Sequence, residues 1–116
     1  MGVVRAGPRV GTEKVLYTFC SHPKPPSDRD GSYPEASLLM DVRGNLYGTT
    51  TTGGTSEQGV VFRLAGRVES VLYNFCSNTG CGEIPVAGVV MDKAGNLYGT
   101  TRQGGSGFGT VFELKR

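Results

Sequence analysis

Apolar and polar residues alternate with a period of two in several short segments of the chain, which is the spacing of β-strands. Alternate residues of Leu46–Thr50 fall on opposite faces of an extended chain, and the run from Glu69 to Phe75 is rich in aromatic and β-branched residues. No segment has apolar residues at helical spacing. The pattern predicts an all-β protein with about eight strands and no helix longer than one turn.

An internal repeat organises the chain. Three segments recur in the same order, and the longest pair matches at 14 of 25 positions. The pairs are shifted by 56, 51 and 50 residues, so the differences in length fall in the predicted loops. The pairs are 15–21 with 71–77 (VLYTFCS and VLYNFCS), 30–54 with 81–105 (both containing GNLYGTT), and 59–64 with 109–114 (GVVFRL and GTVFEL).

Each repeat unit is predicted to form four short strands. A four-stranded antiparallel unit that repeats every 40 to 50 residues or so is typical of a β-propeller blade, so we expect two propeller-like blades. The chain is circularly permuted, because strand 14–20 precedes the first blade (36–75) while the second blade (87–114) lacks its outer strand. We expect residues 1–13 to be a flexible N-terminal extension and residues 14–116 to be a single domain.

The permutation predicts assembly. Two blades cannot close a ring, since propellers have about four to eight blades. Strand 109–114 would have an open edge and strand 14–20 would have no sheet to join, and unpaired backbone groups favour pairing with another chain. We therefore expect a ring of identical copies in which strand 14–20 of one copy completes the second blade of the next. A trimer is favoured, with a dimer or a tetramer as alternatives.

The motif GNLYGTT, followed by a Gly-Gly loop and by G-[VT]-V-F-x-L, resembles the GloVer repeat of bacterial choice-of-anchor tandem-repeat proteins. The VLYTFC and VLYNFC segments, Pro34 and Pro85, and the Asp-x-x-Gly-Asn turns resemble the same repeat, which covers residues 14–114. The resemblance implies a multi-copy, exported context without assigned catalytic residues. Because the sequence shows two copies, no export signal and no anchor, we expect a free-standing protein that assembles its missing copies.

The three cysteines allow a disulfide and, formally, a metal site. Cys76 and Cys81 enclose a loop of four residues, so they can pair if the loop doubles back in an oxidising compartment, while Cys20 is expected to stay free. With His22 the three cysteines could supply four zinc ligands. However, Cys20 and Cys76 end equivalent strands of different blades, which separates them by far more than zinc–ligand bonds of about 2.1–2.3 Å permit. We expect no metal and no cofactor.

The remaining chemical candidates have simpler structural explanations. His22 is the only histidine and lies in a Pro-rich loop, which favours a solvated side chain over a catalytic base. Asp28–Asp30 lacks the spaced oxygen ligands of a calcium loop. Asp41 and Asp92 open the same turn in each copy, so they are expected to cap the turns rather than act as an acid–base pair. The Gly-rich loops lack the Lys and Ser/Thr of a phosphate loop. We expect no catalytic residue.

Charge and hydropathy exclude some partners. A net charge of +2 is too small to indicate nucleic acid or an anionic membrane as partner. No window approaches the roughly 18 apolar residues of a membrane span, and Met1–Val10 lacks the continuous apolar run of a signal peptide. The compartment is left open.

A non-catalytic binding or interaction module is the function that these patterns favour. Small two-blade chains that assemble into sugar-binding propellers offer an analogy at the level of the fold, so carbohydrate is the first ligand class to test. The alternatives are an enzyme whose site is assembled between subunits and a purely structural protein. Polar and aromatic side chains near the second Gly-Gly loop could frame a shallow pocket between blades, namely Tyr98, Thr101, Arg102, Gln103 and Phe108.

Overall fold

The protein is all-β in a computed structural model, which describes residues 3–6, 13–21, 28–76 and 81–116. These residues form antiparallel strands and no helix, which confirms the prediction of an all-β protein. Accordingly, no helix in the described part of the chain could cross a membrane. The strands are β1 (Val3–Ala6), β2 (Lys14–Thr18), β3 (Leu39–Met40), β4 (Leu46–Thr50), β5 (Val60–Ala65), β6 (Val68–Asn74), β7 (Gly82–Glu83), β8 (Val90–Met91), β9 (Leu97–Thr101), β10 (Gln103–Gly104) and β11 (Thr110–Leu114).

Two larger sheets correspond to the two repeats. The first sheet has four strands in the order β3-β4-β5-β6, and the second sheet has three in the order β11-β9-β8. Two further pairs complete the strand set: β1 with β2, called here the N-terminal hairpin, and the short β7 with β10. Among the described residues, no strand of the second sheet corresponds to β6, as the repeat predicted. The described residues do not close into a ring of blades.

Register is the same in both sheets. Gly48 pairs with Phe62 across β4 and β5, and Gly99 pairs with Phe112 across β9 and β11. A Cβ atom on Gly48 would lie 2.8 Å from the Phe62 ring, and one on Gly99 would lie 2.7 Å from the Phe112 ring. The glycine of the LYGTT motif is therefore required because the phenylalanine of the neighbouring strand lies across it.

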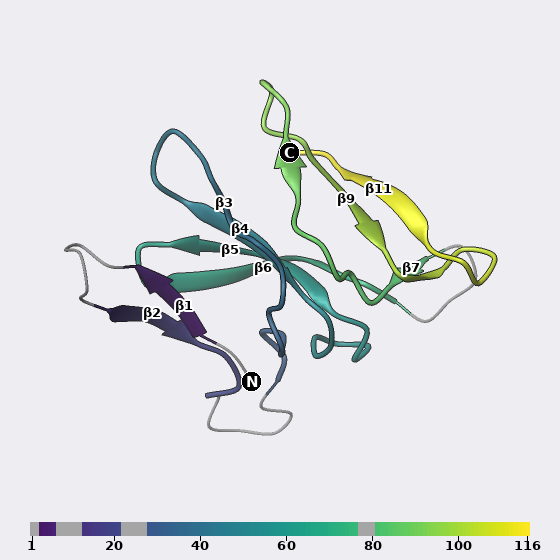
Figure 1. The fold of residues 1–116 in the computed structure, drawn as a ribbon, viewed down its shortest axis with the longest axis horizontal. Helices are drawn as coiled ribbons and strands as arrows, with labels where there is room; N and C mark the ends of the chain where they lie inside the picture. Colours follow the sequence, from purple (N-terminus) through teal and green to yellow (C-terminus); the bar gives the residue numbers. More distant parts are fainter. Residues whose placement is uncertain (1–2, 7–12, 22–27, 77–80) are drawn as a thin grey trace.

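The sheets stack as three layers, with the first sheet between the N-terminal hairpin and the second sheet (Figure 1). We call the face of the first sheet toward the hairpin its back and the face toward the second sheet its front. One core cluster fills the back with Phe19, Val60, Phe62 and Leu64. The other fills the front with Tyr47, Val61, Phe75, Val89 and Leu97. The first sheet is consequently buried on both faces.

Both layer interfaces use the same aromatic contact. Phe19, which follows β2, packs edge-on against Phe62 with ring centroids 5.0 Å apart, and Phe75, which follows β6, packs against Phe112 at 5.2 Å. The interplanar angle is 72° in both pairs. The N-terminal hairpin thus packs on the back of the first sheet in the same way as the front of the first sheet packs on the second sheet. All three layers therefore stack in the same orientation, front to back.

The N-terminal hairpin corrects two expectations. β1 lies within the segment 1–13 that was expected to be an extension, and it pairs with β2, so strand 14–20 does not lack a sheet. The ladder shifts register between Val4 and Arg5, as the β5–β6 ladder does between Val61 and Phe62. β1 pairs with β2 because the backbone N–H and C=O groups of β2 need hydrogen-bond partners. β1 supplies these partners to β2 as β5 supplies them to β6.

The first strand of each of the two larger sheets is shorter than predicted. Only Leu39–Met40 and Val90–Met91 pair as strands, within the segments 36–42 and 87–93 that the apolar runs indicated. The Asp-x-x-Gly-Asn turn begins directly after each of them, so the ladder ends where the turn geometry takes over.

Candidate functional site

Tyr98 lies apart from the other four residues that the sequence singled out for a ligand. It is near the start of β9, where its hydroxyl lies 2.8 Å from Asp92 Oδ2 and 3.0 Å from Glu113 Oε2. The hydrogen bond to Asp92, and then that to Glu113, raises the pKa of Tyr98 to about 12. Tyr98 is therefore held by its own repeat at the turn end of the second sheet.

The other four residues lie at the opposite end of β9, at the Gly-Gly loop. Thr101 is buried, and its Oγ1 donates to the Gln103 carbonyl at 2.8 Å and lies 2.7 Å from Thr110 Oγ1, so it is engaged in structural hydrogen bonds. Arg102 is exposed, and the Phe108 side chain is 93% exposed. The structure does not bring the five together, and none of them lines either groove described below.

The two Asp turns have the same hydrogen bonds in both copies. Asp41 accepts from the backbone N–H groups of Arg43 and Asn45, both at 2.9 Å, from Asn45 Nδ2 at 3.1 Å and from the Tyr47 hydroxyl at 3.0 Å. Desolvation alone would raise the pKa of Asp41, but these hydrogen bonds hold it below its usual value. The expected capping role is confirmed, because the turns use each carboxylate fully.

Asp92 repeats this arrangement in the second copy. It accepts from the Ala94 and Asn96 backbone N–H groups, both at 2.9 Å, from Asn96 Nδ2 at 3.1 Å and from the Tyr98 hydroxyl. The Tyr98 hydrogen bond, followed by that of the Asn96 backbone, holds the pKa of Asp92 below its usual value.

A groove of about 650 Å³ lies between the two Asp turns, and we call it the turn groove. Its walls come from β3 and the first turn on one side and from β8 and the second turn on the other, with β5 and the C-terminal residue contributing. Apolar side chains such as Leu39 and Met91 line part of it. Four basic side chains line the rest: Arg43, Arg63, Lys93 and Arg116. Sequence reasoning did not find this site.

A second, smaller groove of about 340 Å³ lies along β11, and we call it the edge groove. It is lined by Tyr73 and Phe75 from the end of the first sheet and by residues 110–114 of the second. It therefore runs beside the strand whose outer neighbour is absent from the second sheet.

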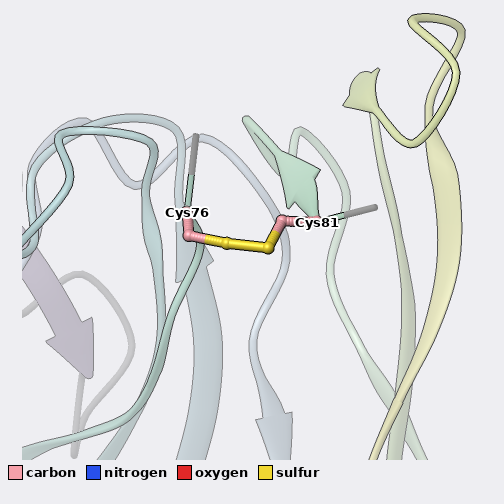
Figure 2. Close-up of a disulfide and its surroundings, with 2 residues drawn as sticks. All are labelled: Cys76 and Cys81. Carbon is pink, nitrogen blue, oxygen red and sulfur yellow. A yellow bond between two sulfur atoms is a disulfide. The ribbon is translucent and has the colours of Figure 1, made fainter. Parts of the chain in front are cut away.

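Cys76 and Cys81 form a disulfide, with Cα atoms 5.7 Å apart, between the segment after β6 and the segment before β7 (Figure 2). Cys20 is a free thiol whose Sγ lies 3.6 Å from the Gly31 carbonyl oxygen, and burial raises its pKa. Within the described ranges, no group of three or more His, Cys, Asp and Glu is placed to hold a metal ion. His22, which the sequence offered as a fourth zinc ligand, lies outside the described residues.

A small polar cluster connects β2 to the first sheet. The Tyr17 hydroxyl donates to Asp30 Oδ2, and the Cys20 backbone N–H donates to Asp30 Oδ1 at 3.4 Å. Glu69, on β6, has a buried Oε2 atom that has no hydrogen-bond partner among the described residues. Burial, followed by the nearby Asp30 carboxylate, raises the pKa of Glu69 to about 8.

The Glu69→Gln substitution is expected to remove a pH dependence of stability. The folded state binds the Glu69 proton more tightly than the unfolded state, in which the pKa of this side chain is near its ordinary value of 4.5, so stability falls as the pH rises from 4.5 to about 8. Because the side chain is partly exposed, we expect the variant to be more stable by about 1–2 kcal/mol at pH 8.5 and equal at pH 4.

Urea denaturation followed by circular dichroism at pH 4, 6 and 8.5 measures this effect. Glu35→Gln, at an exposed carboxyl, is the control and should show no such trend. An equal difference between Glu69→Gln and wild type at every pH would show that folding does not change the pKa of Glu69.

Comparisons with known proteins match the chain to one repeat family. The Gloeobacter/Verrucomicrobia repeat matches residues 3–116. Among curated proteins, the subtilisin-like protease het-Q2 of Podospora anserina is 31% identical over 77 residues, which are 66% of this chain and 19% of the protease. The chain thus spans about a fifth of that relative's length. No solved structure matches the chain.

Proposed function

The chain belongs to the Gloeobacter/Verrucomicrobia (GloVer) repeat family, and on this basis we propose that it is a non-catalytic interaction module whose sheets are propeller-type blades completed by another copy of the chain. The open edge of β11 carries the proposal. In the first sheet β6 covers the outer edge of β5, whereas no described strand pairs with the outer edge of β11. The face of the second sheet that is turned away from the first sheet, which we call its front, is open as well. Val111 on this face is 82% exposed, while its counterpart Val61 is 0% exposed beneath the second sheet.

β2 of a second copy fits this edge. Its VLYTF sequence matches the VLYNF sequence of β6 and the adjoining Phe75, and Phe19 already contacts the first sheet as Phe75 contacts the second. A β2 strand beside β11 would complete a four-stranded blade, and its Phe19 would still pack on Phe62 of its own chain. Repetition of this step around a ring gives six blades from three copies, with two and four copies as alternatives.

The pairing requires an exchange of strands. β1 and β11 both correspond to β5 in the repeat. β1 pairs with β2 as β5 pairs with β6, and β11 pairs with β9 as β5 pairs with β4. β2 cannot pair with both along the same edge. We therefore expect a copy to give up its β1–β2 pairing when its β2 pairs with β11 of the neighbour.

The side chains of the described residues favour binding over catalysis. Asp41 and Asp92 are used by their own turns and cannot serve as an acid–base pair. The similar stretch makes up 19% of a longer protein in Podospora anserina, which supports a module that is combined with other domains. A shared enzyme site between subunits is the alternative. In the edge groove, however, the Thr110 hydroxyl is hydrogen-bonded to Thr101 and the Glu113 carboxylate accepts from Tyr98.

Molar mass in solution tests the proposal. By light scattering at micromolar concentration we expect a mass of three chains, or of two or four. Val111→Lys, which places a charge on the open front of the second sheet, should give a monomer that keeps its fold. Val68→Lys is the matched control, because Val68 is 68% exposed on β6, away from the open edge, and it should assemble like wild type. A monomeric wild-type chain, or an assembled Val111→Lys variant, would contradict the proposal.

A further inference from the structure

The four basic residues of the turn groove lie at positions where the two copies of the repeat differ. In register, Arg43 and Arg63 of the first copy correspond to Ala94 and Glu113 of the second. Lys93 and Arg116 of the second copy correspond to Val42 and Gly66 of the first. Each sheet therefore forms without the basic residue that the other sheet has at the same position. The fold of the repeat does not require any of the four basic residues. They nevertheless line a single groove, because blade stacking brings the front of the first sheet to the back of the second.

The groove's own acids do not neutralise these bases. Asp41 and Asp92 each accept four hydrogen bonds from their own turn, from two backbone N–H groups, one Asn side chain and one Tyr hydroxyl. No ion pair of the four bases is found among the described residues. The side chains that line the groove thus include two more bases than acids, and both acidic side chains have their lone pairs occupied.

Two of the bases are held in place without a polar partner for the side chain. The Arg63 Nε atom is buried and has no hydrogen-bond acceptor among the described residues, which is costly for a charged donor. The Arg116 guanidinium lies over the Tyr47 ring, 5.3 Å from the ring centroid. The backbone N–H of Arg116 donates to Asn96 Oδ1 at 3.0 Å. A ligand that supplies acceptors would satisfy groups that the protein leaves unpaired.

We propose that the turn groove binds a small ligand that carries several carboxylate or phosphate groups. Guanidinium groups bind both anions in bidentate fashion, and Lys93 adds a point charge on the opposite wall. A volume of about 650 Å³ is in the range of pockets for small ligands, and the apolar wall formed by residues such as Leu39 and Met91 suits a carbon skeleton between the charged groups. An acidic oligosaccharide has this combination, whereas a bare inorganic anion would leave the apolar wall uncovered.

Calorimetric titration with trigalacturonate, its trimethyl ester and pyrophosphate tests the inference. The ester has the same skeleton without charge, and pyrophosphate has charge without the skeleton. We expect trigalacturonate to bind, the ester not to bind, and the affinity to fall when NaCl is raised from 20 to 500 mM, because salt screens exposed charges. Binding of pyrophosphate as tight as that of trigalacturonate would instead identify the ligand as a phosphate compound.

The Arg43→Gln/Lys93→Gln variant should weaken binding by about tenfold for each base removed. Arg67→Gln/Arg102→Gln changes the net charge equally outside the groove and should bind like wild type, because neither residue lines the groove. Arg63→Lys retains charge but loses the planar donor, and it should weaken binding as well. Absence of binding to every probe, equal binding of the ester, or equal losses in the two double variants would overturn the inference.

The groove lies within one chain, so this inference does not depend on the proposed assembly. Titrations on Val111→Lys, which is expected to be monomeric, should give the same affinity as wild type. A wild-type chain that is monomeric but binds the anion would contradict only the proposed function, and a wild-type chain that assembles but binds no probe would contradict only the groove.

Discussion

Deleting residues 1–12 is expected to strengthen assembly, and deleting residues 1–21 is expected to abolish it. The shorter deletion removes β1, so β2 is no longer paired within its own chain and is available to β11 of a neighbour. β1 pairs with β2 through four residues, and each net hydrogen bond contributes about 0.5–1.5 kcal/mol. Without β1, no strand of the same chain competes with β11 of a neighbour for β2. The concentration at which copies associate should then fall by roughly thirtyfold, which corresponds to about 2 kcal/mol. The longer deletion also removes β2, and with it the strand that crosses between copies.

Sedimentation velocity over a range of concentrations measures this pair of deletions. A variant in which residues 1–12 are replaced by a Gly-Ser segment of equal length is the control for chain length, and it should behave like the shorter deletion. If the shorter deletion leaves the chain monomeric while the full chain assembles, β1 takes part in the contact and the exchange of strands does not occur.

Phe62→Ala is expected to cost most of the stability of the domain. Phe62 is 0% exposed, packs edge-on against Phe19 and lies across Gly48. Truncation of its side chain therefore opens a cavity in the core cluster at the back of the first sheet. Such truncations cost about 3–5 kcal/mol, which approaches the total stability of many small domains. Phe112→Ala, at the equivalent position of the second sheet, should cost about half as much, because Phe112 is only partly buried.

Denaturant unfolding followed by circular dichroism gives both values, since the chain has no Trp. Assembly must be held constant in this comparison, so both substitutions are best made in the Val111→Lys background. Equal losses for the two would mean that the second sheet is covered as fully as the first in solution.

The sheets of the two repeats were predictable because their determinants are local and occur twice. The Asp turns follow from short-range hydrogen bonding, and the Gly48 and Phe62 pair appears in both copies at the same register. β1 was missed because its VVRA segment shares only a short stretch with the start of β5, too little to stand out beside the longer matches. Its partner could be recognised only once the ladder with β2 was visible.

The turn groove could not be predicted in the same way. A search for repeats gives weight to positions that agree, and the groove consists of positions at which the copies differ, such as Arg63 against Glu113 and Lys93 against Val42. These positions are far apart in the chain, and only the stacking of one sheet on the other makes them neighbours. The ligand residues expected at the Gly-Gly loop were chosen by residue type within one copy, and β9 separates Tyr98 from the rest.

The front-to-back stacking has a consequence for how such chains can evolve. Every layer presents one kind of surface to the layer before it and the complementary kind to the layer after it, as the matching Phe19–Phe62 and Phe75–Phe112 contacts show. A gene duplication that inserts a whole unit therefore introduces a layer that already fits both of its new neighbours, and a deletion of a unit joins two surfaces that already fit each other. Copy number can then change by recombination between units without any new contact having to arise by mutation.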